Sequence, residues 1–140
     1  MKEVFDIVVT VQEVQEVITA KATVKMLVFT AVCEGTGFVG RTLPGAVDRQ
    51  IIQADGTGVL SARYLMEGVD AGGQPCKVYI DNTGTIDKDG EIVTSPLIYT
   101  DSNELQHLQD SKLYGKVTFE EGTLHVHISV SDDFIKAENN

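Results

Sequence analysis

The sequence predicts an all-β protein: a single antiparallel, closed or nearly closed β-barrel of about 8–10 strands with at most one short helix. Apolar and polar side chains alternate along most of the chain, which is the pattern of strands with one buried face. Turn-forming Gly, Pro and Asp residues separate these runs at roughly ten-residue spacing. The 140 residues, 42% of them hydrophobic, suit one core, so we expect a single domain over residues 1–140.

The clearest alternation lies in the last third of the chain. Val126 and Ile128 share one face of residues 123–130, and the opposite face is polar. Residues 113–119 alternate in the same way, and Gly122 between the two runs can supply the positive φ of a short hairpin loop. The two runs therefore predict a β-hairpin.

Three further runs, residues 26–33, 59–67 and 76–83, also predict strands. Residues 59–67 and 76–83 alternate like the C-terminal hairpin. Residues 26–33 are instead apolar or β-branched almost throughout, which is typical of a strand that is covered on both faces.

Two segments depart from simple alternation. Residues 11–21 place apolar side chains at helical spacing but are rich in β-branched residues, which indicates a strand or an irregular segment. Residues 101–109 predict one or two helical turns, with Ser102 as the N-cap and with Leu105 and Leu108 on the buried side.

The net charge, the apolar runs and the two cysteines bear on the partners, the location and the thiol state of the protein. The formal net charge of −10 disfavours phosphate backbones and anionic membranes, so we expect neither nucleic acid nor membrane as a partner. The N-terminus lacks the order of a secretory signal, and the longest apolar run is far below the roughly 20 residues of a spanning helix, which favours a cytoplasmic location. Cys33 and Cys76 show no metal-type spacing, and we expect free thiols with a packing role.

A series of turn, polar and strand residues runs through residues 34–84. Its members are Glu34, Gly35, Gly40, Leu43, Pro44, Gly45, Asp48, Gln50, Asp55, Gly56, Leu60, Ala62, Arg63, Tyr64, Val78, Tyr79, Ile80, Asn82 and Gly84. In order and spacing the series resembles an uncharacterised barrel family called domain of unknown function 3237. The resemblance implies an antiparallel barrel without an established activity. The chain departs from the family at Arg49, where an aromatic is common, and at residues 107–109, where an aromatic-Leu-Asn triplet is usual.

The candidate catalytic residues are Asp48, Arg63 and Asn82, all within this segment. At one mouth of a barrel, Asp48 would accept a proton, Arg63 would stabilise an oxyanion and the Asn82 amide would orient a ligand. The alternative is an internal ion pair or a loop-fixing hydrogen bond, with Asn82 capping the turn before Gly84. Arg63 faces away from its apolar neighbours, so it lines the lumen only if they do not. The sequence leaves the lumen face open.

Three histidines form a weaker constellation. His125 and His127 project from the same side of a strand, where they could bind Zn²⁺ with His107 as a third ligand. The shared side is polar, so solvated histidines are the simpler interpretation and no metal is assigned. The chain has neither a GxGxxG turn nor a phosphate-binding loop, and we expect no cofactor.

Two functions follow as hypotheses. The first is small-molecule binding at the barrel mouth, with simple acid–base catalysis such as isomerisation or dehydration. The alternative is a non-enzymatic structural or interaction module that acts as a homo-oligomer. It would use Arg63, Glu67, Lys77 and Tyr79 on the outer strand faces. A homodimer is compatible with both.

Overall fold

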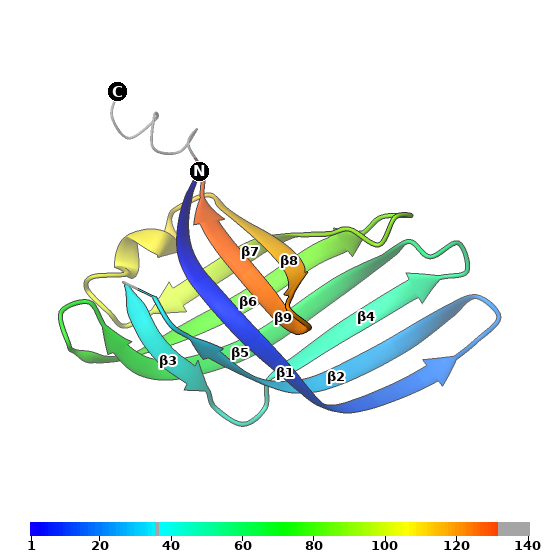
Figure 1. Ribbon diagram of the computed structural model, residues 1–140, viewed down its shortest axis with the longest axis horizontal. Coiled ribbons are helices and arrows are strands. Elements are labelled where there is room, and N and C mark those ends of the chain that lie inside the picture. The colour runs from blue at the N-terminus through cyan, green and yellow to red at the C-terminus, as the bar shows by residue number, and fades with distance from the viewer. Residues whose placement is uncertain (36, 132–140) are drawn as a thin grey trace.

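The computed structural model describes residues 1–35 and 37–131 (Figure 1). Its elements are β1 Lys2–Ile18, β2 Ala22–Cys33, β3 Phe38–Thr42, β4 Val47–Gln53, β5 Gly58–Asp70, β6 Pro75–Ile86, β7 Ile92–Thr100, the 3₁₀ turn η1 Gln106–Gln109, β8 Leu113–Glu120 and β9 Thr123–Val130. The all-β prediction is confirmed, and the predicted domain's last residues, 132–140, lie outside the described part. No helix among the described residues is long and apolar enough to cross a membrane.

The strands form one antiparallel sheet that closes into a ring of eight strands. The order around the ring is β1, β9, β8, β7, β6, β5, β4 and β2, and β1 closes it by pairing with β2. Strand β3 occupies the same position as β4, between β5 and β2, but at the other end of both strands. The ring therefore has a β3 end and a β4 end, which differ in what they enclose.

Side-chain alternation places the core inside the ring. On β5 the residues Leu60, Ala62, Tyr64 and Met66 are buried, whereas Arg63 between them is exposed. On β9 the buried residues are Val126, Ile128 and Val130, as the sequence predicts. The lumen is thus the apolar face of both strands.

Strand β2 is covered on one face only, whereas the sequence predicts a strand that is covered on both faces. Phe29, Ala31 and Cys33 are buried, but Met26 and Val32 on the opposite face are 39% and 45% exposed. The prediction of a strand covered on both faces is wrong, because no second layer of the described residues covers the outside of the ring. The segment at residues 11–21 is a strand as far as Ile18, since it pairs with β2 on both sides of a register shift between Val11 and Glu13.

The β3 end of the ring is filled. Phe5 and Phe38 stack edge to face there, with ring centroids 6.0 Å apart, and Met66, which pairs with Thr42 of β3, is fully buried in the same core cluster. The predicted helical turns appear as a short 3₁₀ turn that closes this end. Leu108 is buried there, and the N–H of Leu105 donates a hydrogen bond to Ser102 Oγ at 3.3 Å.

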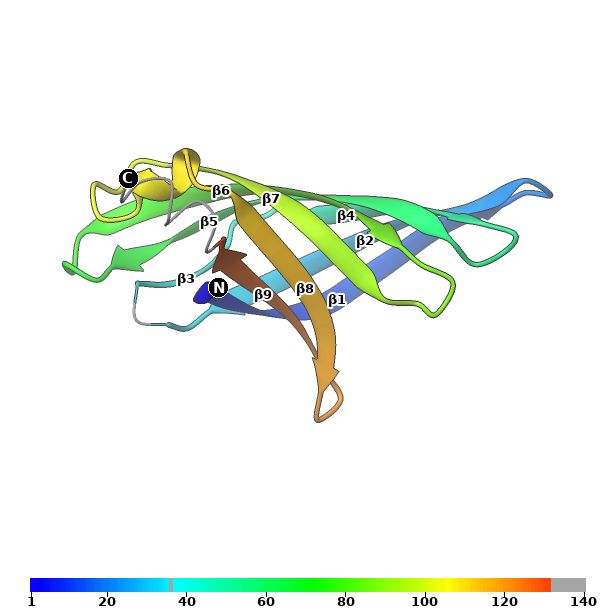
Figure 2. The ribbon, with the colours of Figure 1, turned by 90° about the horizontal axis from the view of Figure 1, so that it is seen from above.

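The β4 end is open. Pairing between β1 and β9 stops at Val9 and Leu124, whereas β1 continues alongside β2 to Ile18. Figure 2 shows the consequence: the β8–β9 hairpin bends away from the long β1–β2 hairpin, and the ring splays at this end. Gly122, with φ 79°, forms the tip of the β8–β9 hairpin as predicted.

Candidate functional site

A cavity of about 240 Å³ opens inside the β4 end of the ring. Every strand except β3 contributes to its lining, which consists of Val9, Val11, Leu27, Phe29, Asp48, Gln50, Leu60, Ala62, Tyr64, Asn82, Ile92, Val117, Phe119, Leu124 and Val126. Four of these side chains carry polar groups that can make directional hydrogen bonds, and the others are apolar. The cavity is therefore an apolar chamber with a small number of polar groups, the usual composition of a ligand site.

The polar groups share one wall. Asp48 on β4 pairs with Ala62 on β5, and Ala62 pairs with Asn82 on β6. Directly paired residues project to the same face, so the small Ala62 side chain leaves space between the carboxylate and the amide, whose strands lie about 10 Å apart. Tyr64 follows two residues along β5, on the same face. The opposite wall, formed by β1, β8 and β9, is apolar.

Several buried polar atoms of this wall have no hydrogen-bond partner. Asp48 Oδ2 accepts a hydrogen bond from Gln50 Nε2 at 2.9 Å, but Asp48 Oδ1 is buried and has no partner. Asn82 Oδ1 and the Tyr64 hydroxyl are also buried without a partner. Buried polar atoms in folded proteins are nearly always paired, because an unmade hydrogen bond costs about 1–3 kcal/mol. Three such atoms on one wall of a cavity indicate a site whose partner comes from outside the chain.

Burial also changes the proton affinities of this wall. Desolvation raises the pKa of Asp48 above its ordinary value, against the smaller opposing effects of the Gln50 hydrogen bond and the Arg49 charge. Burial likewise raises the pKa of the Tyr64 phenol, and the negative charge of Asp48 adds to this effect. Asp48 is therefore a stronger base than a solvated carboxylate, and Tyr64 remains a neutral O–H group.

Asp48 and Asn82, two of the three predicted site residues, line the cavity, but Arg63 does not. Arg63 is exposed on the outer face of β5, because the apolar residues on either side of it fill the lumen. Its inward neighbour Tyr64 stands in the polar wall instead. Sequence alternation alone would have identified Tyr64 once the lumen face of β5 was known.

The other predicted candidates lie apart from the cavity. His125 and His127 project from the outer face of β9, and His107 lies on η1 and does not belong to their cluster. Both cysteines are free and buried, as predicted, and burial raises the pKa of Cys33 to about 12. A thiol with that pKa is protonated at neutral pH and is a poor nucleophile.

A second, wider hollow of about 480 Å³ lies on the outside of the ring, near Arg41, Glu67 and Lys77. None of the buried, unpartnered polar side-chain atoms among the described residues belongs to it. The inner cavity is the better candidate site, because its wall contains buried polar atoms without a hydrogen-bond partner and the outer hollow does not.

The strands form a closed antiparallel ring that is filled at one end and hollow at the other. The protein therefore belongs to the structural class of barrel-like proteins with an internal cavity. No family model matches the chain. A curated UPF0311 protein of Clostridium acetobutylicum is 44% identical over 50 residues, which make up 36% of this chain and 29% of that protein. The match thus spans less than a third of that relative, and membership of the family that residues 34–84 resemble stays a prediction.

Solved structures extend the likeness to nearly the whole chain. A protein of unknown function from Clostridium acetobutylicum matches with a TM-score of 0.77 at 22% identity, over 93% of this chain and 95% of that one. A β-barrel-like protein from Acinetobacter baumannii matches at 0.70 and 14% identity, over 92% and 93% of the two chains. An enzyme from Penicillium herquei matches at 0.70 and 16% identity, over 91% and 92%. At these identities the likeness shows a shared barrel-like fold.

Proposed function

We propose that the protein binds a small, mainly apolar molecule in the cavity at the β4 end of its ring. The single observation that supports this most strongly is the set of three buried, unpartnered polar atoms, on Asp48, Tyr64 and Asn82, that line one wall of an otherwise apolar chamber. A binding partner that supplies the missing hydrogen bonds recovers the cost of burying these atoms.

The cavity restricts the chemistry of the ligand. Two of the unpartnered atoms, Asp48 Oδ1 and Asn82 Oδ1, are acceptors, so the ligand brings O–H or N–H donors on one edge. Apart from Gln50 and the Tyr64 hydroxyl, the rest of the lining is apolar, so the remainder of the ligand is apolar too. A cavity of about 150 Å³ holds benzene, and about 240 Å³ therefore admits a larger ring or two fused rings.

The same wall is suited to simple acid–base chemistry. With its raised pKa, Asp48 is the proton acceptor of the proposed site, in the role that the sequence predicts for it. The Tyr64 hydroxyl replaces Arg63 as the donor that stabilises a developing oxyanion, and Asn82 orients the substrate. In an isomerisation, the proton that Asp48 removes returns to another atom of the enolisable substrate, and in a dehydration it is passed to the leaving hydroxide, which departs as water. The enzyme from Penicillium herquei shares the fold at low identity, and this motivates an assay for turnover.

Binding of 2-naphthol tests the proposal, because this probe joins two fused apolar rings to a single O–H donor. We expect a dissociation constant of about 10–100 µM from fluorescence titration, since a probe of this size has only a few kcal/mol of contact energy available. 2-Methoxynaphthalene keeps the rings but lacks the donor, and we expect it to bind at least about 10-fold more weakly.

Two neighbouring substitutions provide matched variants. Ala62→Leu places a larger side chain between Asp48 and Asn82 and should abolish binding, whereas Arg63→Leu adds the same side chain to the outer face and should leave binding unchanged. Circular dichroism verifies that both variants fold. Equal binding of the two probes, or undiminished binding by Ala62→Leu, would contradict the proposed site.

A second candidate function, self-association, is favoured by the free edge of β1. Beyond Val9 the strand pairs with β2 alone, and its other edge has no strand partner among residues 1–35 and 37–131. Val14, Val17 and Ile18 on this segment are 51–73% exposed. An unpaired, apolar edge strand is a template for pairing with another chain, and two copies could join edge to edge in this way.

Light scattering tests this second candidate at micromolar protein concentrations. We expect a homodimer that becomes a monomer when Val14 and Val17 are both replaced by Lys, because edge lysines oppose strand pairing. Val93→Lys, at an exposed position on the outer face of β7, is the control and should leave the dimer intact. A monomeric wild type, or a dimer that survives the double substitution, would contradict the model of edge pairing.

A further inference from the structure

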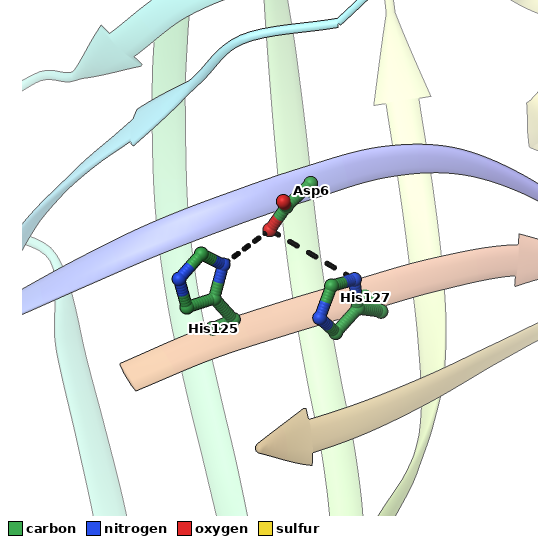
Figure 3. A group of neighbouring side chains, drawn as sticks. All are labelled: Asp6, His125 and His127. Carbon is green, nitrogen blue, oxygen red and sulfur yellow. Dashed lines mark hydrogen bonds and ion pairs between the residues drawn. The ribbon is translucent and has the colours of Figure 1, made fainter. Parts of the chain in front are cut away.

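A cluster of imidazoles and carboxylates lies on the outer face of the ring, where the first and last strands meet. His125 and His127 project from β9, and Asp6 projects beside them from β1, directly paired with His127. Figure 3 shows both imidazoles turned toward Asp6. We propose that this cluster is a binding site for a divalent transition-metal cation of the Zn²⁺ type, with His125, His127 and Asp6 as ligands.

The distances are close to those of a coordination sphere. His125 Nδ1 lies 2.8 Å from Asp6 Oδ1, and His127 Nδ1 lies 3.8 Å from the same oxygen. All three ligand atoms lie within 4.8 Å of one another. Bonds of about 2.0–2.2 Å to a tetrahedral Zn²⁺ place neighbouring ligand atoms roughly 3.3 Å apart, so side-chain movements of about 1 Å are enough to admit the ion.

Two glutamates complete the surroundings of His127. Glu3 Oε1 lies 2.6 Å from His127 Nδ1, but Glu3 is outside the group whose ligand atoms all lie within 4.8 Å of one another, so its side chain would have to move to become a fourth ligand. Glu120 Oε2 lies 2.5 Å from His127 Nε2, the nitrogen on the other side of the ring, and 3.7 Å from His125 Nδ1, so it contacts both imidazoles. A carboxylate that holds the second nitrogen of a ligating histidine fixes its tautomer and orientation, and this arrangement recurs at zinc sites. The two imidazole rings are stacked, with an interplanar angle of 9°.

Charge also favours a cation here. Three carboxylates, on Glu3, Asp6 and Glu120, surround two imidazoles. Lys116 lies across from His127 on β8 but makes no ion pair with this cluster among the described residues. Imidazole nitrogens prefer Zn²⁺ and its transition-metal neighbours, whereas Mg²⁺ and Ca²⁺ prefer oxygen ligands alone. Two imidazole nitrogens and a carboxylate oxygen therefore favour a transition-metal cation such as Zn²⁺ over Mg²⁺ or Ca²⁺.

The position of the cluster predicts a structural effect. Asp6 and the two histidines come from opposite ends of the chain and meet only where β9 pairs with β1. A metal held by both strands binds the folded ring and not the unfolded chain, and so stabilises the fold by mass action. The metal would thus hold the ring closed at its N- and C-terminal strands.

Titration of the metal-free full chain with ZnCl₂ tests the proposal by calorimetry and by thermal unfolding. We expect one Zn²⁺ per chain with a dissociation constant of about 1 µM or lower, a rise of several degrees in Tm at saturation, and no response to MgCl₂. His125→Gln and His127→Gln should each weaken binding at least about 100-fold, and Glu120→Gln should weaken it about 10- to 100-fold.

His107→Gln is the matched control, because it removes an imidazole on η1, outside the cluster, and should bind zinc like the wild type. X-ray absorption at the zinc edge provides a second measurement, with two imidazoles and oxygen ligands expected and no sulfur. The absence of binding at about 100 µM Zn²⁺ would overturn the site. Equal affinity of the wild type and both histidine variants, or a sulfur ligand, would overturn it as well.

Discussion

Replacement of Asp48 by Asn is expected to weaken binding of 2-naphthol about 10-fold and, at neutral pH, to raise the melting temperature. Burial raises the pKa of Asp48 in the folded protein, so ionisation of this carboxyl favours the unfolded chain. Below the pH range in which ordinary carboxyls ionise, Asp48 is protonated in both the folded protein and the unfolded chain, and its full contribution to stability is present. As the pH rises through the folded-state pKa, this contribution is lost, because the unfolded chain ionises more easily. Asn carries no charge at any pH and avoids this loss. The gain in Tm is therefore largest at neutral pH and disappears in acid.

Thermal unfolding at about pH 7.5 and about pH 3 measures the gain, which we expect to reach roughly 1 kcal/mol in the free energy of unfolding at the higher pH. Asp55→Asn is the control, and its expected change in Tm at neutral pH is opposite to that of Asp48→Asn. Hydrogen bonds from the Thr57 hydroxyl and N–H lower the pKa of the exposed Asp55, so its replacement should lower the Tm at neutral pH. A loss of stability in Asp48→Asn at neutral pH, or unchanged naphthol binding, would show that Asp48 is an ordinary structural carboxylate.

Gly68→Ala is expected to cause the largest loss of stability of any single substitution considered. Gly68 on β5 pairs with Gly40 on β3, and the two backbones approach so closely that a Cβ on Gly68 would lie 1.9 Å from the Val39 carbonyl oxygen. That Cβ would also lie 2.5 Å from Gly40 Cα. Both atoms belong to the backbone, so no side chain can move aside, and β3 must separate from β5. We expect a loss of about 3 kcal/mol or more.

Urea denaturation measures the loss, with Gly37→Ala as the matched control. A Cβ on Gly37 would lie 3.7 Å from Leu105 Cδ2, an ordinary contact, and should change the free energy of unfolding by less than about 0.5 kcal/mol. A similar result for both variants would mean that β3 and β5 are further apart in solution than the structure places them.

Five strands could be predicted because their signals are local, whereas β3, β4 and β7 were not predicted. Alternation along residues 123–130 and a Gly at position 122 depend only on neighbouring residues, and both predictions are confirmed. The exposed outer face of β2 was missed, because the composition of a strand does not show whether a second layer covers it.

The candidate sites could be predicted only in part. Asp48 and Asn82 were identified through their place in a family-like segment, but the inclusion of Arg63 depended on which face of β5 is internal. Tyr64 was missed for the same reason. Asp6 was missed as a neighbour of His125 and His127, because 119 residues separate it from His125 and only the pairing of β1 with β9 brings them together.

By itself, the sequence determined the approximate positions of five strands, namely β2, β5, β6, β8 and β9, several of the turns between strands, and which side chains share a strand face. Each of these depends on contacts within a few residues. Only the tertiary structure decided which face became the lumen and that one end stayed hollow. It also decided which distant side chains meet. The physical reason is that ring closure and strand register are set by all the strands packing together, and no single segment carries that information.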